Sequence, residues 1–108
     1  MTNFLALELS YEFLEAVRPA IERLKTTCGH LGDQLERAAT RVTLSLAESR
    51  GRRGADRRKY FRYADGSLDE SRSALRAGVC LRHLGADDVA EALRIGDRLG
   101  RMLGGLLR

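Results

Sequence analysis

Apolar residues recur at spacings of three, four and seven along nearly the whole chain, which is the repeat of one face of an α-helix. The first apolar stripe, in a segment of about 4–28, consists of Leu7, Leu14, Val17, Ile21, Leu24 and Cys28. Pro19, the single proline, falls inside this segment and should bend the helix rather than end it. A start at Ser10 is the alternative, but Phe13 stands where a capping box needs Glu or Gln. Few aromatic residues and no tryptophan argue against a β-sandwich or barrel, so we predict an all-α protein.

A second helix should follow a break at 29–32, where two glycines interrupt the first pattern. Asp33 is a suitable N-cap for this helix, which should continue to about Ser49. Its expected inner face consists of Leu35, Ala38, Ala39, Val42 and Leu46. Gly51 and Gly54 should end it.

A third helix should run over about 55–84, with two adjacent stripes facing its neighbours. One stripe of mostly small residues consists of Tyr60, Ala64, Ser67, Ser71, Ala74, Gly78 and Leu81, and the other of Phe61, Leu68, Leu75 and Val79. Small side chains let another backbone approach closely, so this helix should be central to the packing.

Gly85 should close the third helix, and Asp87 or Asp88 should begin a fourth. The apolar residues of the fourth helix are Val89, Leu93, Leu99, Leu103 and Leu106. Glycine recurs at every fourth position of this helix, at Gly96, Gly100 and Gly104. Each glycine inside a helix costs about 1 kcal/mol relative to alanine. We therefore expect these glycines to pack tightly or to contact another subunit, with a frayed C-terminus as the alternative.

Short connections between long consecutive helices favour antiparallel neighbours. Residues 1–108 should therefore form a single domain, an up-down-up-down four-helix bundle, whose small and apolar stripes favour oligomers. Glutamates interrupt the apolar residues near the N-terminus, and no run approaches the length of a membrane span. With only two cysteines and no signal-peptide pattern, we expect a soluble, cytoplasmic protein that does not bind membranes.

The positive charge of the chain is concentrated in the segment 50–62. Its basic residues are Arg50, Arg52, Arg53, Arg57, Arg58, Lys59 and Arg62, against the single acid Asp56, whereas the whole chain has a net charge of +4. Cations at a helix N-terminus oppose the macrodipole, so a bound phosphate would explain this placement. Tyr63 is the best candidate to stack on an unpaired base, whereas Tyr60 and Phe61 are expected in the core. An acidic protein partner and a solvated turn are the alternatives.

Cys28 with His30, and Cys80 with His83, lie at helix ends that an antiparallel bundle brings to one pole. Two thiols and two imidazoles suit tetrahedral zinc. Their spacings match no zinc-finger pattern, however, and a small thiol on an apolar helix face is usually part of the core. We therefore predict no metal and no cofactor. No nucleophile with a base and an orienting group is indicated, so we expect no enzymatic activity.

Three short segments carry a resemblance to a known family. They are Ala47-Glu48-Ser49-Arg50-Gly51-Arg52-Arg53, Lys59-Tyr60-Phe61-Arg62-Tyr63-Ala64 and Gly66-Ser67-Leu68-Asp69-Glu70. This order resembles the four-helix-bundle proteins encoded in intervening sequences of large-subunit ribosomal RNA genes. These are similar in turn to the accessory variability protein of diversity-generating retroelements. Ser49 departs from the glycine that is usual in the family.

The resemblance implies a homopentamer with a basic surface and, in the retroelement members, binding to nucleic acid and to a reverse transcriptase. It brings no enzymatic activity. Glu48 and Glu70 lie in the shared motifs, and we expect each to pair with arginines such as Arg52 or to bridge subunits. We predict a non-enzymatic accessory protein that binds RNA or DNA. The alternative is a structural or adaptor oligomer whose basic rim binds an acidic protein.

Overall fold

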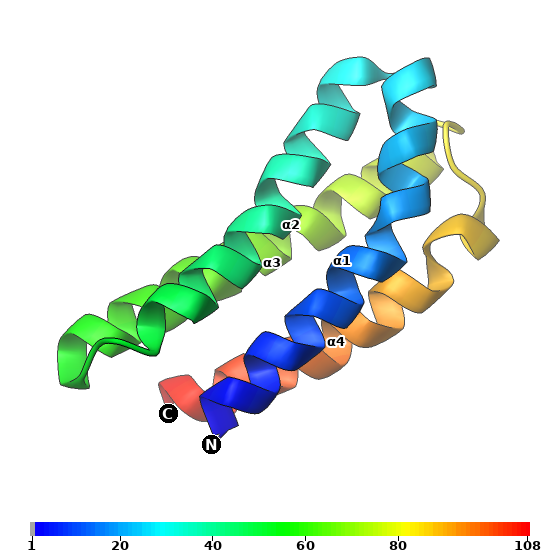
Figure 1. Cartoon of the computed structure of the whole chain (residues 1–108). Helices are drawn as coiled ribbons and strands as arrows, with labels where there is room; N and C mark the ends of the chain where they lie inside the picture. The colour runs from blue at the N-terminus through cyan, green and yellow to red at the C-terminus, as the bar shows by residue number, and fades with distance from the viewer. Residues whose placement is uncertain (1) are drawn as a thin grey trace.

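The computed structural model describes residues 2–108, with side chains from residue 4 onward. Its helices are α1 (Thr2–Thr27), α2 (Gly29–Ser49), α3 (Gly54–Cys80) and α4 (Ala86–Leu107). Consecutive helices run antiparallel, and α4 packs against α1 to close the bundle (Figure 1). The described chain is thus the all-α, up-down-up-down four-helix bundle that the sequence predicts, elongated to 42 × 22 × 19 Å.

The inner faces of the helices form one apolar core. Its largest fully buried side chains are Phe13, Val17, Leu24, Leu35, Val42, Leu46, Leu68, Leu75, Leu99 and Leu103. Two hydroxyls cross this core between α1 and α2: Thr43 donates to Ser10 Oγ over 3.0 Å, and Ser10 donates to the carbonyl of Leu7 over 2.6 Å. Each of these buried hydroxyls has a hydrogen-bond partner, so the core does not bear the free-energy cost of burying an unpaired polar group.

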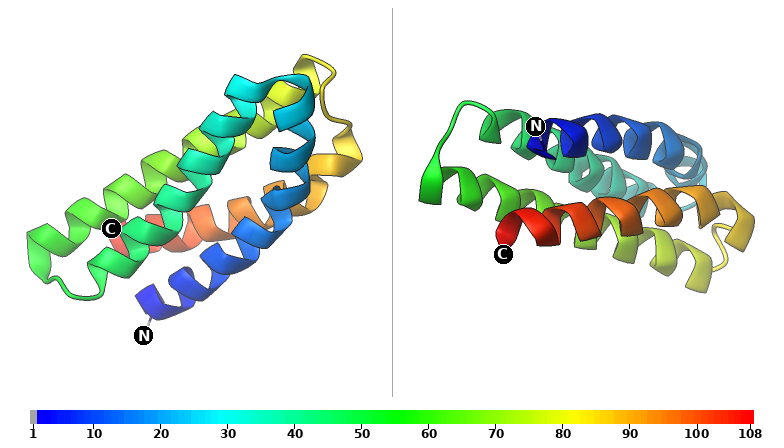
Figure 2. Two further views of the ribbon diagram at one scale, coloured as in Figure 1. Left: turned by 45° about the horizontal axis from the view of Figure 1, so that its top comes forward. Right: turned by 90° about the horizontal axis from the view of Figure 1, so that it is seen from below.

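The first helix is as long as predicted and continues through Pro19. Its axis bends in the second half, as the change of direction of α1 in Figure 2 shows. Proline has no N–H for the preceding turn and its ring presses on that turn, which accounts for a bend at this place.

The predicted break at 29–32 is wrong. Cys28 alone separates α1 from α2, and α2 begins at Gly29 instead of after Asp33. Gly32 is buried inside α2, and a Cβ there would lie 3.0 Å from the backbone nitrogen of Lys25. The glycine therefore permits a close approach of the two helices and does not interrupt α2.

The third helix ends at Cys80, before its predicted end at about 84. Arg82 has a φ of 67°, the left-handed conformation that commonly terminates helices. The N–H of His83 donates to the carbonyl of Gly78 over 2.9 Å, and the N–H of Arg82 donates to that of Val79 over 3.0 Å. These two bonds form a Schellman motif.

Gly85 therefore does not close α3, contrary to the prediction. It is the N-cap of α4, and its N–H donates to Asp88 Oδ2 over 2.7 Å. Leu81, expected on the inner face of α3, lies beyond the helix end and is exposed. Over residues 2–108, no helix combines the length and the apolar character that crossing a membrane requires.

Candidate nucleic-acid interface

The turn between α2 and α3 and the C-terminal end of α4 lie at the same end of the bundle (Figure 1). Arg58 of α3 donates a hydrogen bond from Nη2 to the carbonyl oxygen of Leu107, the last residue of α4. This contact brings Arg108 to the segment 50–62. We call this end the basic pole; its residues are Arg50, Arg52, Arg53, Arg57, Arg58, Lys59, Arg62 and Arg108. Sequence reasoning missed Arg108 because only the folded bundle places it there.

Two arginines of the basic pole cap the ends of other helices. Arg57 donates from Nε to the carbonyl of Ser49, the last residue of α2, over 3.1 Å, and Arg58 does the same for α4. Both side chains are half-buried. A cation at a helix C-terminus complements the partial negative charge of its free carbonyls. These contacts therefore offset the unfavourable position of the two cations at the start of α3.

Arg52 is held by carboxylates on both sides. Its Nη2 lies 2.7 Å from Glu48 Oε2, its Nη1 lies 3.0 Å from Asp56 Oδ2, and its guanidinium lies 4.7 Å from the centre of the Tyr60 ring. Glu48 thus pairs with the arginine named for it from the sequence. The hydrogen bond from Arg52 is the main cause of the lowered pKa of Asp56, which also has Lys59 Nζ at 3.3 Å.

The remaining cations of the segment 50–62 are differently placed. Arg50 lies over the ring of Phe4, with its guanidinium carbon 5.1 Å from the ring centre. Arg53 and Arg62 are exposed, and neither forms an ion pair or side-chain hydrogen bond with the described part of the chain. Their donors are available to an external anion.

The three aromatic residues of α3 differ in exposure. Phe61 is 4% exposed, which confirms its place in the core. Tyr60 is not in the core, contrary to the expectation, but is half-buried beneath Arg52 and Lys59. Tyr63 is 51% exposed, and its ring meets that of Tyr60 edge to face, with centres 5.4 Å apart. Tyr63 therefore offers an accessible ring surface, and its contact with Tyr60 holds the ring on one side.

A groove of about 420 Å³ begins beside Tyr63 and lies between α2 and α3. Its lining residues are Arg41, Ser45, Arg62, Tyr63, Gly66, Ser67 and Glu70. Glu70 Oε1 lies 3.3 Å from Arg41 Nη2, and both side chains are half exposed. The groove thus joins the exposed end of the basic segment to the motif that starts at Gly66.

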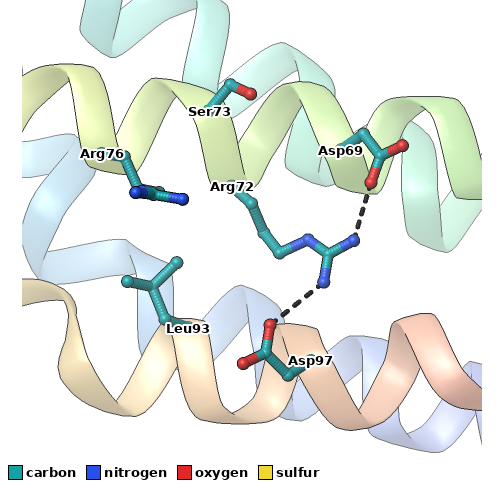
Figure 3. A pocket seen from close by; sticks show the side chains of 6 residues that line it. All are labelled: Asp69, Arg72, Ser73, Arg76, Leu93 and Asp97. Atoms are coloured by element: carbon teal, nitrogen blue, oxygen red, sulfur yellow. Dashed lines mark hydrogen bonds and ion pairs between the residues drawn. The ribbon is translucent and has the colours of Figure 1, made fainter.

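A larger cavity, of about 520 Å³, lies between α3 and α4 (Figure 3). Its central side chain, Arg72, extends from α3 toward α4 and binds Asp69 at 2.7 Å and Asp97 at 3.1 Å. A Cβ at Gly96 would lie 3.4 Å from the stem of Arg72, and one at Gly100 would lie 3.2 Å from its Nη1. Two of the three glycines of α4 therefore make close contacts within the chain, in line with the tight packing expected of them.

Gly104 differs from the other two glycines, because a Cβ there would meet nothing within 4 Å. The pole with the two cysteines offers no metal site: over the described residues, no three His, Cys, Asp or Glu side chains gather in a way that could hold an ion. Cys28 is half-buried, with Sγ 3.7 Å from His30 Nδ1. Cys80 is exposed, so the expectation of a core thiol is wrong for it.

A family model described as 23S rRNA-intervening sequence protein matches residues 3–105. The chain belongs to this family. The match extends the resemblance seen in the motifs of 47–70 to nearly the whole chain, including the segment 50–62 and the groove beside Tyr63. No curated protein and no solved structure gave a match.

Proposed function

We propose that this intervening-sequence protein is a non-enzymatic accessory protein that binds RNA or DNA through its basic pole. The observation that carries the proposal is that Arg53 and Arg62 are exposed and have no ion pair or side-chain hydrogen bond within the described residues, and that the ring of Tyr63 is exposed as well. Guanidinium groups bind phosphate oxygens in bidentate fashion, and aromatic rings stack on unpaired bases. Binding would be mostly electrostatic and weakly selective for sequence.

Three finer parts of the proposal rest on the family and on its resemblance to the retroelement proteins. The family's description names an intervening sequence of 23S rRNA, which makes a structured or unpaired RNA a natural ligand class. We further propose that the protein acts as a homopentamer, which repeats the basic pole around the assembly, and that it assists a reverse transcriptase. Repetition would raise the apparent affinity for a long polyanion through effective concentration.

The test replaces three exposed cations of the basic pole and leaves the capping arginines in place. Arg53, Lys59 and Arg62 are changed together to glutamine, and binding of single- and double-stranded nucleic acid is followed by fluorescence anisotropy at several salt concentrations. For duplex DNA, log K should fall with log salt at about −0.9 per phosphate neutralised in the parent. The triple variant should show a flatter line and weaker binding.

A matched control removes the same charge elsewhere. Arg18, Arg37 and Arg98 are exposed and lie outside the basic pole, so their change to glutamine lowers the net charge equally. If both triple variants weaken binding to the same extent, net charge and not the basic pole is responsible. Negligible affinity of the parent near physiological salt would contradict the proposal and favour the adaptor function, in which the basic pole binds an acidic protein.

A further inference from the structure

Gly66 has no structural reason to be glycine. It lies in the interior of α3 and is exposed, its φ is not positive, and a Cβ there would meet nothing within 4 Å. Glycine destabilises a helix interior relative to alanine, so its presence calls for a compensating role. Because Gly66 lines the groove between α2 and α3, its missing side chain leaves room for a ligand at that position of the groove.

The other lining groups are those that recognise a nucleobase. Tyr63 offers a ring for stacking, Arg62 offers a guanidinium with no partner among the described residues, and Glu70 and Arg41 present an acceptor beside a donor. The volume of about 420 Å³ lies within the range of about 300–1,000 Å³ that is usual for small-molecule sites. The groove is therefore large enough for one base with its sugar.

The arrangement of the donor Arg41 beside the acceptor Glu70 favours one base over the others. On its Watson–Crick edge, guanine carries the O6 acceptor next to two adjacent donors, N1–H and N2–H. A carboxylate accepts from both donors at once, and an arginine donates to O6. Adenine, cytosine and uracil do not present two adjacent donors on this edge, so a carboxylate accepts only one bond from each.

We propose that the groove of Arg41, Tyr63, Gly66 and Glu70 binds one unpaired guanine base of single-stranded RNA. The base stacks on Tyr63, its N1–H and N2–H donate to Glu70, its O6 accepts from Arg41, and Arg62 binds the adjoining phosphate. This inference rests on the proposed function and adds to it a base-selective element. Single strands suit such a site because their bases are free to expose the Watson–Crick edge.

The experiment compares two labelled RNA strands of about 12 nucleotides, within the usual site size of a single-strand binder. One strand is all uridine and the other has a single central guanosine. By anisotropy, the parent should bind the guanosine strand at least about 5-fold more tightly, as one bidentate base contact allows. Glu70→Gln should remove most of this preference, while the exposed ion pair that it breaks contributes little to folding.

Gly66→Ala separates a ligand role from a packing role. It should raise the midpoint of thermal unfolding, because alanine favours the helix and meets no neighbour, and yet weaken binding of the guanosine strand. Gly29→Ala is the control: that glycine is also exposed with open space around it, but it lies at the start of α2, away from the groove. It should leave binding unchanged.

Equal binding of the two strands by the parent overturns the inference. If the triple variant at Arg53, Lys59 and Arg62 still loses affinity in that case, the proposed function stands without the base-selective site. Loss of thermal stability in Gly66→Ala would show a packing role and would also overturn the inference. Failure of the parent to bind either strand, together with negligible affinity for DNA in the salt series, would overturn the proposed function as well.

Discussion

Arginines only a few residues apart have different physical roles in the basic pole. Arg57 and Arg58 donate to the terminal carbonyls of two other helices, whereas Arg52 lies between two carboxylates. Arg53 and Arg62 remain available to an external anion. The segment 50–62 therefore contains more basic residues than are free to bind phosphate. The position of each residue in the turn or on α3 decides whether its side chain is free.

Arg82 offers a first prediction at the scale of one residue. Its positive φ places a side chain where glycine is strongly preferred, since a Cβ crowds the following carbonyl in this conformation. Arg82→Gly should therefore raise the free energy of unfolding by about 1 kcal/mol, read from chemical denaturation followed by circular dichroism.

The same substitution inside a helix supplies the control. Arg98 is exposed and lies within α4, where Arg98→Gly should lower the free energy of unfolding by about 1 kcal/mol. Opposite signs at the two positions would confirm the Schellman end of α3. A lower free energy of unfolding for Arg82→Gly would instead show that the side chain of Arg82 makes a contact whose stabilisation exceeds the cost of the backbone strain.

At the scale of the helices, interiors are easier to predict from sequence than ends. Every residue named for the inner face of α2 is buried, because a spacing of three and four is a local pattern. The ends depend on contacts between segments. Gly32 is an example: from sequence alone it indicates a break, because nothing in the neighbouring sequence reveals that the backbone of Lys25 packs against it in the folded bundle.

The candidate interface divides in the same way. The exposure of Tyr63 and the burial of Phe61 follow from their positions on α3 and were predicted. The capping roles of Arg57 and Arg58 were not, because their acceptors belong to the ends of α2 and α4. Arg108 entered the site for the same reason, and a charge pattern along the sequence carries no signal for such contacts.

Arg58 gives the prediction at this scale, since it joins the start of α3 to the end of α4. Arg58→Met keeps an unbranched stem but removes the donor, so the free energy of unfolding should fall by about 1 kcal/mol. Amide hydrogen exchange in the last turn of α4 should become faster. Arg62→Met, one turn further along α3 and at a side chain that pairs with none of residues 4–108, should change stability by less than about 0.5 kcal/mol.

Hydrogen exchange also tests whether Arg58 holds the last turn of α4. If the last turn of α4 exchanges equally in the two variants, then the contact from Arg58 does not hold that turn. Both variants lose one positive charge, so a difference between them cannot arise from net charge.

At the scale of the whole molecule, the glycine series of α4 bears on the contact between subunits. Gly96 and Gly100 pack against Arg72 within the chain, and their small size is explained by that contact. Gly104 lies in the same series, within the helix and with open space where its side chain would be. A helix-interior glycine without a contact in its own chain suits the close approach of a second copy.

The last prediction is therefore that Gly104 lies in a contact between subunits. Light scattering on a sizing column should give the parent a mass of about five times the 12.0 kDa subunit, as the proposed homopentamer requires. Gly104→Leu should lower this mass and retain the helical circular dichroism spectrum, because the extra side chain meets nothing in its own chain but overpacks a close contact by about 1–3 kcal/mol. Gly66→Leu, at the other open glycine inside a helix, should leave the mass unchanged. A parent that runs as a monomer at tens of micromolar, or a Gly104→Leu variant with the mass of the parent assembly, would contradict the prediction.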